Sequence, residues 1–373
     1  MSKVMFFLPS LRGGGAERVM VTVANVLASK GFDVDLVVCQ LEGPYLNNVS
    51  PQVNVVSLQV GRVVLGLPKL IRYLIITRPL VVLSTLVHAN VTMSLAHMVS
   101  LSSSTLVLRD ANVVHAGNSS SVSMYIVNLA SRFFYRRADK IIAVSQAVKD
   151  SLVKYRKVLI EDINIAYNPV VDDELKTQSY LLPEHSWWSN EANLTNGCVK
   201  RAPIILAAGR LAYAKGFDVL IEAFAKLNID NARLVILGEG HCLKDLLALS
   251  DRLGVGARVS LPGFEKNPFS FMRHSDLFVL SSRWEGLPNT LIQAMACGTP
   301  VISTDCPGGS REILEGGKWG RLVPVDDSEA LALAMHQSLE AEDHPDVTRR
   351  AQDFSVDAAV ERYMEIMGLP CPT

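Results

Sequence analysis

The stretch LFVLSSRWEGLPNTLIQAMACGTPVIS, residues 277–303, decides the fold class because it spells out a strand, a turn, a helix and a second strand. Residues 277–280 are apolar and predict a strand that ends at Ser281. A Gly-Leu-Pro turn then starts a helix near Asn289, and Gly298 ends it before the strand at residues 301–303. This order is typical of a βαβ unit in a parallel sheet.

The same alternation runs along the chain on both sides of this stretch. Apolar runs that predict strands occur at 4–8, 34–39, 53–58, 81–84, 105–108, 141–144 and 163–167, and again at 204–208, 234–237, 259–261 and 322–325. Continuous apolar strands spaced by helices indicate parallel sheets that are covered on both faces. We therefore predict an α/β protein with two Rossmann-like, doubly wound domains, whose strands point their carboxyl ends at a central cleft.

A polar segment divides the two series of strands. Residues 1–170 are predicted to form the first domain, and residues 203–351 the second. Residues 171–202 lack a clear period and are rich in Asn and Ser between 175 and 201, so we interpret them as a linker or insertion.

The composition excludes several classes of protein. The 373 residues carry 36 basic and 37 acidic side chains, a formal net charge of -1, which argues against a dedicated nucleic-acid binder. Six cysteines without Cys-x-x-Cys spacing indicate neither a zinc site nor a disulfide framework. The first residues predict a strand rather than a signal peptide, so a cytoplasmic chain is expected. Residues 79–108 lack charge, but their Ser, Thr, Asn and His content favours a strand and a turn over a membrane span.

Two loops carry features that suit a phosphate. Residues 11–18, LRGGGAER, follow the first strand and open a helix, whose free N–H groups and glycines would admit an anion; a plain tight turn is the alternative. Arg210 and Lys215 follow the first strand of the second series and would grip a diphosphate, unless they are merely solvated. By contrast, Asp33-Val34-Asp35 opens a strand far from the expected cleft, and we assign it no role.

The turn after residue 281 holds the richest pattern. The N–H groups of residues 286–290 and the helix dipole would point at an anion. Glu285 lies in this loop, where a carboxylate suits sugar hydroxyls or a transient positive centre better than a phosphate. Gln293 is predicted to lie about one turn into the helix.

Together these motifs resemble the family 4 glycosyltransferases, retaining enzymes of the GT-B fold. The resemblance runs in order from about Val4 to Tyr363 through GGGAER, GRL…KG, GEG, PGF, EGLPN and AMACGTPVI. It implies a nucleotide-sugar donor, no metal ion and no other cofactor. It also implies that the last helix, within residues 352–373, packs back on the first domain.

The resemblance assigns roles to single residues. Arg210 and Lys215 match the basic pair that holds the donor diphosphate in place of a metal, and Glu285 matches a glutamate beside the donor sugar, so these three form the expected catalytic set. The expected donor-binding set is Gly14, Gly15, Arg210, Lys215, Gly238, Phe264, Gly286, Leu287, Asn289, Thr290 and Gln293.

Gln293 stands where relatives have a second glutamate for the ribose hydroxyls. An amide loses the charge-assisted bond, so altered ribose recognition is expected in an enzyme that is still active. Relatives also carry a histidine on the acceptor side. Residues 109–112 occupy the corresponding loop, and His115 and His88 are two alternatives that we leave open.

The resemblance and the charges imply transfer of a hexose or N-acetylhexosamine, from a UDP-sugar, to a glycan or lipid-linked acceptor in polysaccharide or lipopolysaccharide assembly. Residues 131–140 and 69–78 mix basic and large apolar side chains, which suit an anionic membrane surface, so peripheral contact at the inner face of the cell membrane is expected; half-buried helix faces are the alternative. Two rival functions are a sugar-nucleotide epimerase or hydrolase of GT-B fold, and a nucleotide-sugar-binding subunit without catalysis.

Overall fold

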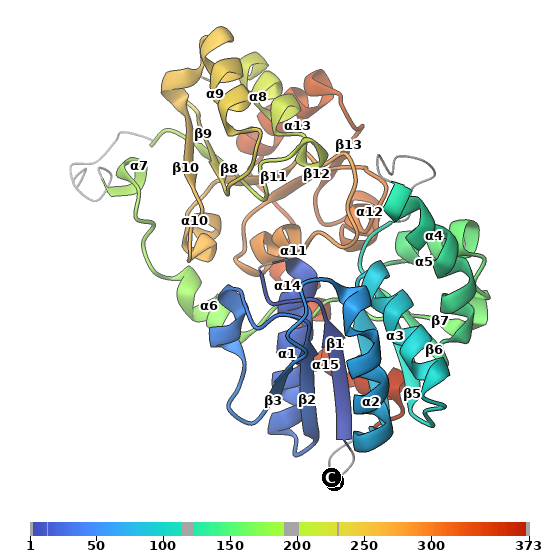
Figure 1. Ribbon diagram of the computed structural model, residues 1–373. Coiled ribbons are helices and arrows are strands. Elements are labelled where there is room, and N and C mark those ends of the chain that lie inside the picture. The colour runs from blue at the N-terminus through green and yellow to red at the C-terminus, as the bar shows by residue number, and fades with distance from the viewer. Residues whose placement is uncertain (1–2, 13, 114–121, 190–200, 230, 371–373) are drawn as a thin grey trace. The chain divides into compact units, whose positions relative to one another are not determined.

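The computed structural model describes residues 3–12, 14–113, 122–189, 201–229 and 231–370, and it divides the chain into two compact units (Figure 1). Unit 1 contains residues 1–169 and 356–373, and unit 2 contains residues 170–355. Each unit is a parallel sheet with helices, so the predicted α/β class is confirmed. The last helix, α15 (Val356–Met367), belongs to unit 1 and contacts α1 (Gly15–Ser29).

The sheet of unit 1 has seven strands in the order β3-β2-β1-β4-β5-β6-β7. Each strand corresponds to one of the apolar runs in the first half of the sequence. The strands are β1 (Lys3–Leu8), β2 (Asp33–Val38), β3 (Asn54–Ser57), β4 (Val81–Thr85), β5 (Thr105–Asp110), β6 (Lys140–Ala143) and β7 (Ile163–Ile165). The connecting helices include α2 (Leu67–Thr77), α3 (Val87–Val99), α4 (Val122–Phe134) and α5 (Gln146–Ser151).

The sheet of unit 2 has six strands in the order β10-β9-β8-β11-β12-β13. The strands are β8 (Ile204–Ala208), β9 (Arg233–Leu237), β10 (Val259–Gly263), β11 (Leu277–Leu280), β12 (Val301–Thr304) and β13 (Arg321–Val323). The helices are α6 (Asp173–Ser179), α7 (Ser186–Ser189), α8 (Phe217–Lys226), α9 (Leu243–Arg252), α10 (Pro268–Arg273), α11 (Asn289–Ala296), α12 (Ser310–Ile313), α13 (Ser328–Glu340) and α14 (Val347–Ala351).

The uncharged stretch of residues 79–108 folds into β4, α3 and most of β5. Among the described residues, no helix combines the length and the apolar character that crossing a bilayer requires.

The segment predicted as a linker, residues 171–202, begins inside unit 2 and is packed as far as residue 189. Asp172 caps α6 by accepting a hydrogen bond from the Leu175 N–H at 2.7 Å, and α6 contacts α10. The indole N–H of Trp188 donates to the His274 carbonyl at 2.9 Å, and its ring meets Phe271 at 5.2 Å between centroids. Residues 171–189 of the predicted linker or insertion therefore form an arm that packs on unit 2; residues 190–200 lie outside the described part of the chain.

Hydrogen bonds join the two segments at which the chain passes from one unit to the other, residues 170–171 and 354–355. The N–H groups of Val170 and Val171 both donate to the Phe354 carbonyl, at 3.0 and 3.1 Å, and Val171 forms a parallel bridge with Ser355. The segment that leaves unit 1 and the one that returns to it therefore run side by side at this point.

A buried acidic residue explains the Asp-x-Asp sequence on β2. Asp35 is completely buried and accepts hydrogen bonds from Lys3 at 2.8 Å, Asn54 at 2.8 Å and Tyr73. Burial raises the pKa of this carboxyl, but the three donors outweigh burial and leave the pKa below its ordinary value. Asp35 therefore joins β1, β2, β3 and α2.

Candidate functional site

Strand order places two of the predicted clusters next to each other. In unit 2, β8 pairs with both β9 and β11, so the winding of the sheet reverses between β8 and β11. Ligands of such sheets bind outside the carboxyl ends of the strands at this reversal. Residues 209–215 follow β8 and residues 281–289 follow β11, so both clusters lie at the reversal.

Three side chains of these clusters meet at one oxygen atom. The Lys215 ammonium donates to Glu285 Oε1 at 2.5 Å, and the Ser282 hydroxyl donates to the same oxygen at 2.6 Å. The Glu285 side chain is 12% exposed and that of Lys215 is 23% exposed. Lys215 and Glu285, which were each predicted as site residues but not as partners, are thus in direct contact, whereas Ser282 was not predicted.

Backbone contacts hold the Lys215 turn on the end of β11. Gly216 adopts φ +60°, and a Cβ there would overlap with the Ser281 carbonyl oxygen. The Ser281 hydroxyl donates to the Lys215 carbonyl at 2.8 Å, and the Arg283 N–H donates to the Ala214 carbonyl at 2.8 Å. The turn and the strand end therefore form one rigid ledge.

The Arg283 side chain reinforces the same ledge. Its guanidinium donates to both carboxylate oxygens of Asp218, at 3.0 and 2.8 Å, to the Tyr213 carbonyl at 2.7 Å and to Asp326 at 2.7 Å. Burial lowers the pKa of Arg283, but these carboxylates more than compensate and raise it. Arg283 is a structural cation, unlike the two predicted site cations.

Arg210 lies just beyond β8 and is exposed. No hydrogen bond or ion pair joins its guanidinium to another residue in the described part of the chain. Its planar guanidinium, with five N–H donors and no bond to a described residue, matches the geometry of a phosphate.

The carboxyl edge of the sheet continues through Gly238 and Phe264. The Gly209 N–H donates to the Leu237 carbonyl at 2.9 Å, and the Gly238 N–H donates to the Gly263 carbonyl at 2.7 Å. A Cβ on Gly238, at φ +128°, would overlap with the Gly209 carbonyl, so this close approach requires glycine. Phe264 follows β10 and is 68% exposed. The structure thus brings these predicted residues to the edge that carries Arg210.

A second loop supports the turn from Glu285 to Asn289. The Glu285 N–H donates to the Pro307 carbonyl at 3.0 Å, and the Gly309 N–H donates to the Gly286 carbonyl at 2.9 Å. A Cβ on Gly308 would lie 2.5 Å from the Glu285 carbonyl oxygen. Residues 306–309 therefore fix the backbone that carries Glu285.

The remaining predicted residues of this segment lie just before α11 or within it. Leu287 is buried, α11 begins at Asn289 and continues through Thr290, and Gln293 lies one turn into it with 8% exposure.

In unit 1, the glycine-rich turn lies at the corresponding reversal, between β1 and β4. Gly14 is the N-cap of α1 and Gly15 is its first residue, and a Cβ on Gly14 would overlap with the Glu17 carboxylate. His88 lies in the first turn of α3; desolvation lowers the pKa of its imidazole, and the charge of Glu17 opposes that shift. His115 lies outside the described residues.

Arg109 occupies a different environment from the loop predicted at residues 109–112. It is the fifth residue of β5 and is completely buried. Its guanidinium donates to the Tyr363 hydroxyl at 2.7 Å, the Asn168 side-chain carbonyl at 2.6 Å and the Thr85 hydroxyl at 3.1 Å. The loop assignment is wrong for Arg109 and for Asp110, which are the last two residues of β5 and are both buried; Arg109 joins β5 to α15.

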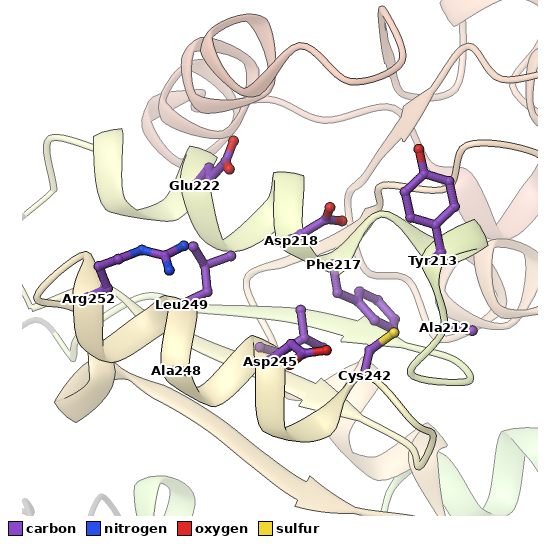
Figure 2. A pocket seen from close by; sticks show the side chains of 11 residues that line it. Ala212, Tyr213, Phe217, Asp218, Glu222, Cys242, Asp245, Ala248, Leu249 and Arg252 are labelled. Atoms are coloured by element: carbon purple, nitrogen blue, oxygen red, sulfur yellow. The ribbon is translucent and has the colours of Figure 1, made fainter.

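A cavity of about 460 Å³ lies between α8 and α9, and none of the predicted donor residues lines it (Figure 2). Figure 2 shows Asp218, Glu222 and Asp245 around this groove, with Arg252 at its far end. Three carboxylates make it unfavourable for a diphosphate. Among the described residues, no group of three or more His, Cys, Asp or Glu side chains has the arrangement of a metal site.

Two family models match the chain, each over one unit. The model described as Glycosyltransferase Family 4 matches residues 13–174, and the model described as Glycosyl transferases group 1 matches residues 195–353. A Campylobacter jejuni relative, N-acetylgalactosamine-N,N'-diacetylbacillosaminyl-diphospho-undecaprenol 4-alpha-N-acetylgalactosaminyltransferase, is 30% identical over 91% of this chain and 91% of its own length. The chain is a glycosyltransferase, and its resemblance to family 4 is confirmed.

Other comparisons extend this result. An uncharacterized glycosyltransferase of Methanocaldococcus jannaschii is 32% identical over 64% of this glycosyltransferase, which spans 65% of that relative. The crystal structure of Anabaena Alr3699/HepE in complex with UDP superposes with a TM-score of 0.79 at 20% identity, covering 99% of this chain and 100% of that one. The fold is GT-B, as the resemblance to family 4 implied.

Proposed function

We propose that this glycosyltransferase moves a hexose or N-acetylhexosamine from a UDP-sugar to a glycan or lipid-linked acceptor, with retention of anomeric configuration and without a metal ion. The observation that carries the proposal is the cluster at the reversal of the second sheet, where Arg210 has no partner among the described residues and Lys215 meets Glu285. Two cations beside one carboxylate suit a diphosphate joined to a sugar.

The charges at this cluster match the charge that develops during transfer. The bond between the anomeric carbon and the phosphate oxygen breaks, and a bond to the acceptor oxygen forms on the same face. The acceptor proton passes to the leaving phosphate oxygen. Arg210 and Lys215 would stabilise the negative charge on the diphosphate, a type of contribution that is worth about 3–4 kcal/mol per preorganised donor in other enzymes.

Names of relatives support the choice of substrates. The Campylobacter jejuni relative is named for transfer onto a diphospho-undecaprenol-linked sugar with an alpha linkage, and HepE was solved with UDP. These names favour a UDP-sugar and a lipid-linked acceptor in glycolipid or polysaccharide assembly.

Substitution of Arg210 tests the donor site. We expect Arg210→Ala to weaken UDP binding by about 2–4 kcal/mol and to slow transfer accordingly. A panel of nucleotide sugars, ranked by thermal stabilisation of the wild-type protein, would first identify the donor. Lys244→Ala, on α9, is the matched loss of a surface cation. Equal effects of the two substitutions would contradict the proposed site, and NMR of the product's anomeric carbon would test retention.

An exposed face of α4 is the proposed contact with the membrane. Ile126, Leu129 and Phe133 are 59, 56 and 53% exposed and recur at helical spacing. Exposed Arg136 and Arg137 follow them, with the Arg137 guanidinium 5.1 Å from the Phe133 ring centre. Apolar side chains beside cations suit an anionic bilayer, so we place the enzyme at the inner face of the cell membrane.

Flotation with vesicles tests this contact. Leu129→Glu should abolish binding to phosphatidylglycerol-containing vesicles, while Leu333→Glu, on α13 with 60% exposure, should leave it unchanged. Binding that is insensitive to Leu129→Glu would show that α4 does not face the bilayer.

A further inference from the structure

The Lys215 ammonium is held by a carboxylate in the structure, although the proposed function needs it for the diphosphate. Its Nζ atom donates to Glu285 Oε1, and no other hydrogen bond joins Nζ to a described residue. The diphosphate and Glu285 are both anionic, so they compete for the same cation.

Glu285 has a second anchor that does not depend on Lys215. The Ser282 hydroxyl donates to the same Oε1, and Ser282 is completely buried. The Ser282 carbonyl in turn accepts from the Thr304 hydroxyl at 2.5 Å. With its backbone fixed by the Pro307 carbonyl, Glu285 would keep its place if Lys215 moved away.

The other carboxylate oxygen of Glu285 is available. Oε2 accepts no hydrogen bond from a residue in the described part of the chain. A carboxylate with one oxygen held by a serine and the other open can accept hydroxyl donors in a fixed geometry.

We propose that Lys215 and Glu285 form an exchangeable ion pair, which the donor diphosphate opens by taking the ammonium. Ser282 is then the positioning residue that holds Glu285 toward the sugar hydroxyls. This inference rests on the proposed donor site. It explains why a carboxylate stands among phosphate-binding groups: it neutralises Lys215 when no donor is bound, and it becomes free for the sugar when the donor arrives.

A double-mutant cycle tests the exchange. UDP and inorganic pyrophosphate would be titrated calorimetrically into the wild-type protein, Glu285→Gln, Lys215→Met and the double variant. Because Lys215 no longer has to leave a carboxylate, Glu285→Gln should bind UDP about three- to tenfold more tightly, although it transfers sugar more slowly. In the Lys215→Met background, the same substitution should change affinity by less than about twofold.

Each outcome separates the exchange from the donor site itself. Unchanged or weaker UDP binding by Glu285→Gln would overturn the exchange. An equal gain in both backgrounds would also overturn it, because the gain would then reflect only repulsion between carboxylate and phosphate. Wild-type protein that binds neither UDP nor pyrophosphate would overturn the proposed donor site as well.

The role of Ser282 has its own readout. Ser282→Ala should lower kcat by about tenfold and leave UDP affinity within about twofold, because the hydroxyl acts on Glu285 rather than on the diphosphate. Ser303→Ala is the matched control: Ser303 is equally buried, on β12, and its hydroxyl donates to the neighbouring Thr304 carbonyl and bonds no other residue that the structure describes. Equal kcat values for the two variants would overturn the positioning role.

Discussion

Replacement of Gly216 by alanine should damage the donor site through the backbone alone. Gly216 adopts φ +60°, a left-handed conformation that costs a residue with a Cβ roughly 1–2 kcal/mol. The new Cβ would also overlap with the Ser281 carbonyl oxygen, which belongs to the backbone and cannot rotate away. Relief of such an overlap typically costs a further ~1–3 kcal/mol. We therefore expect Gly216→Ala to lower the free energy of unfolding of unit 2 by about 2–5 kcal/mol.

Gly254 provides the control for backbone strain. It adopts φ +72°, but no heavy atom would lie within 4 Å of a new Cβ. Gly254→Ala should therefore show the conformational penalty without the overlap. Thermal denaturation should place its Tm roughly 2–8 °C below the wild type, with Gly216→Ala lower still.

The affinity for UDP shows whether Gly216→Ala damages the donor site or only lowers the stability of the unit. A shift of the Gly216 turn moves Lys215, so Gly216→Ala should bind UDP at least about tenfold more weakly, which is 1.4 kcal/mol. Gly254→Ala should bind UDP as the wild type does. The contrary result is that Gly216→Ala and Gly254→Ala lower the free energy of unfolding equally and both bind UDP as the wild type does. That result would show that the contact between the Gly216 turn and β11 does not position Lys215 for the donor.

Three further outcomes are expected. Tyr363→Phe should lower the free energy of unfolding, measured in urea, by about 1.5–3 kcal/mol, because it leaves a buried N–H of Arg109 without an acceptor. The same change at exposed Tyr180 should leave the free energy of unfolding unchanged. A Tyr363→Phe variant as stable as the wild type would refute the importance of this buried hydrogen bond. The folded-state pKa of Asp35 is depressed, so its carboxylate contributes to the free energy of unfolding above the ordinary pKa of 3.8, and this contribution is lost as the pH falls through the lower, folded-state pKa. Asp35→Asn should therefore remove this part of the pH dependence of urea unfolding. If the full pH dependence persisted, it would belong to other carboxyl groups. Gln293→Glu should keep or raise transfer activity, and complete inactivation would show that the ribose binds elsewhere.

Most of the fold was predictable from the sequence because its strands are buried on both faces. Apolar runs such as residues 204–208 and 277–280 need no partner information to be recognised, and the reversal between β8 and β11 follows once their order is known. The packed arm of residues 171–189 was not predictable. Its α6 helix is seven residues long, about two turns, which is too short for a hydrophobic period to be recognised in the sequence. Trp188 is buried through its contacts with Phe271 and His274 at α10.

The site was predictable where residues act through the backbone or carry charge in a loop. Arg210, Lys215 and Glu285 all lie in loops that follow the carboxyl ends of two strands, β8 and β11, of the second sheet. Ser282 was missed because a serine after an apolar strand is the common pattern of a loop. Arg109 was misplaced because the apolar run ends one residue earlier, and its partner Tyr363 lies 254 positions away in the sequence.

The division of the chain has a consequence for protein synthesis. Unit 2 is one continuous segment, residues 170–355, whereas unit 1 is completed only by residues 356–367. A polypeptide synthesised only as far as residue 355 contains the continuous segment of unit 2, but its buried Arg109 guanidinium in unit 1 lacks the Tyr363 hydroxyl that accepts its hydrogen bond. The unit that begins the chain is thus the later one to be completed, and loss of residues 356–367 would damage unit 1 rather than the unit that precedes the cut in the sequence.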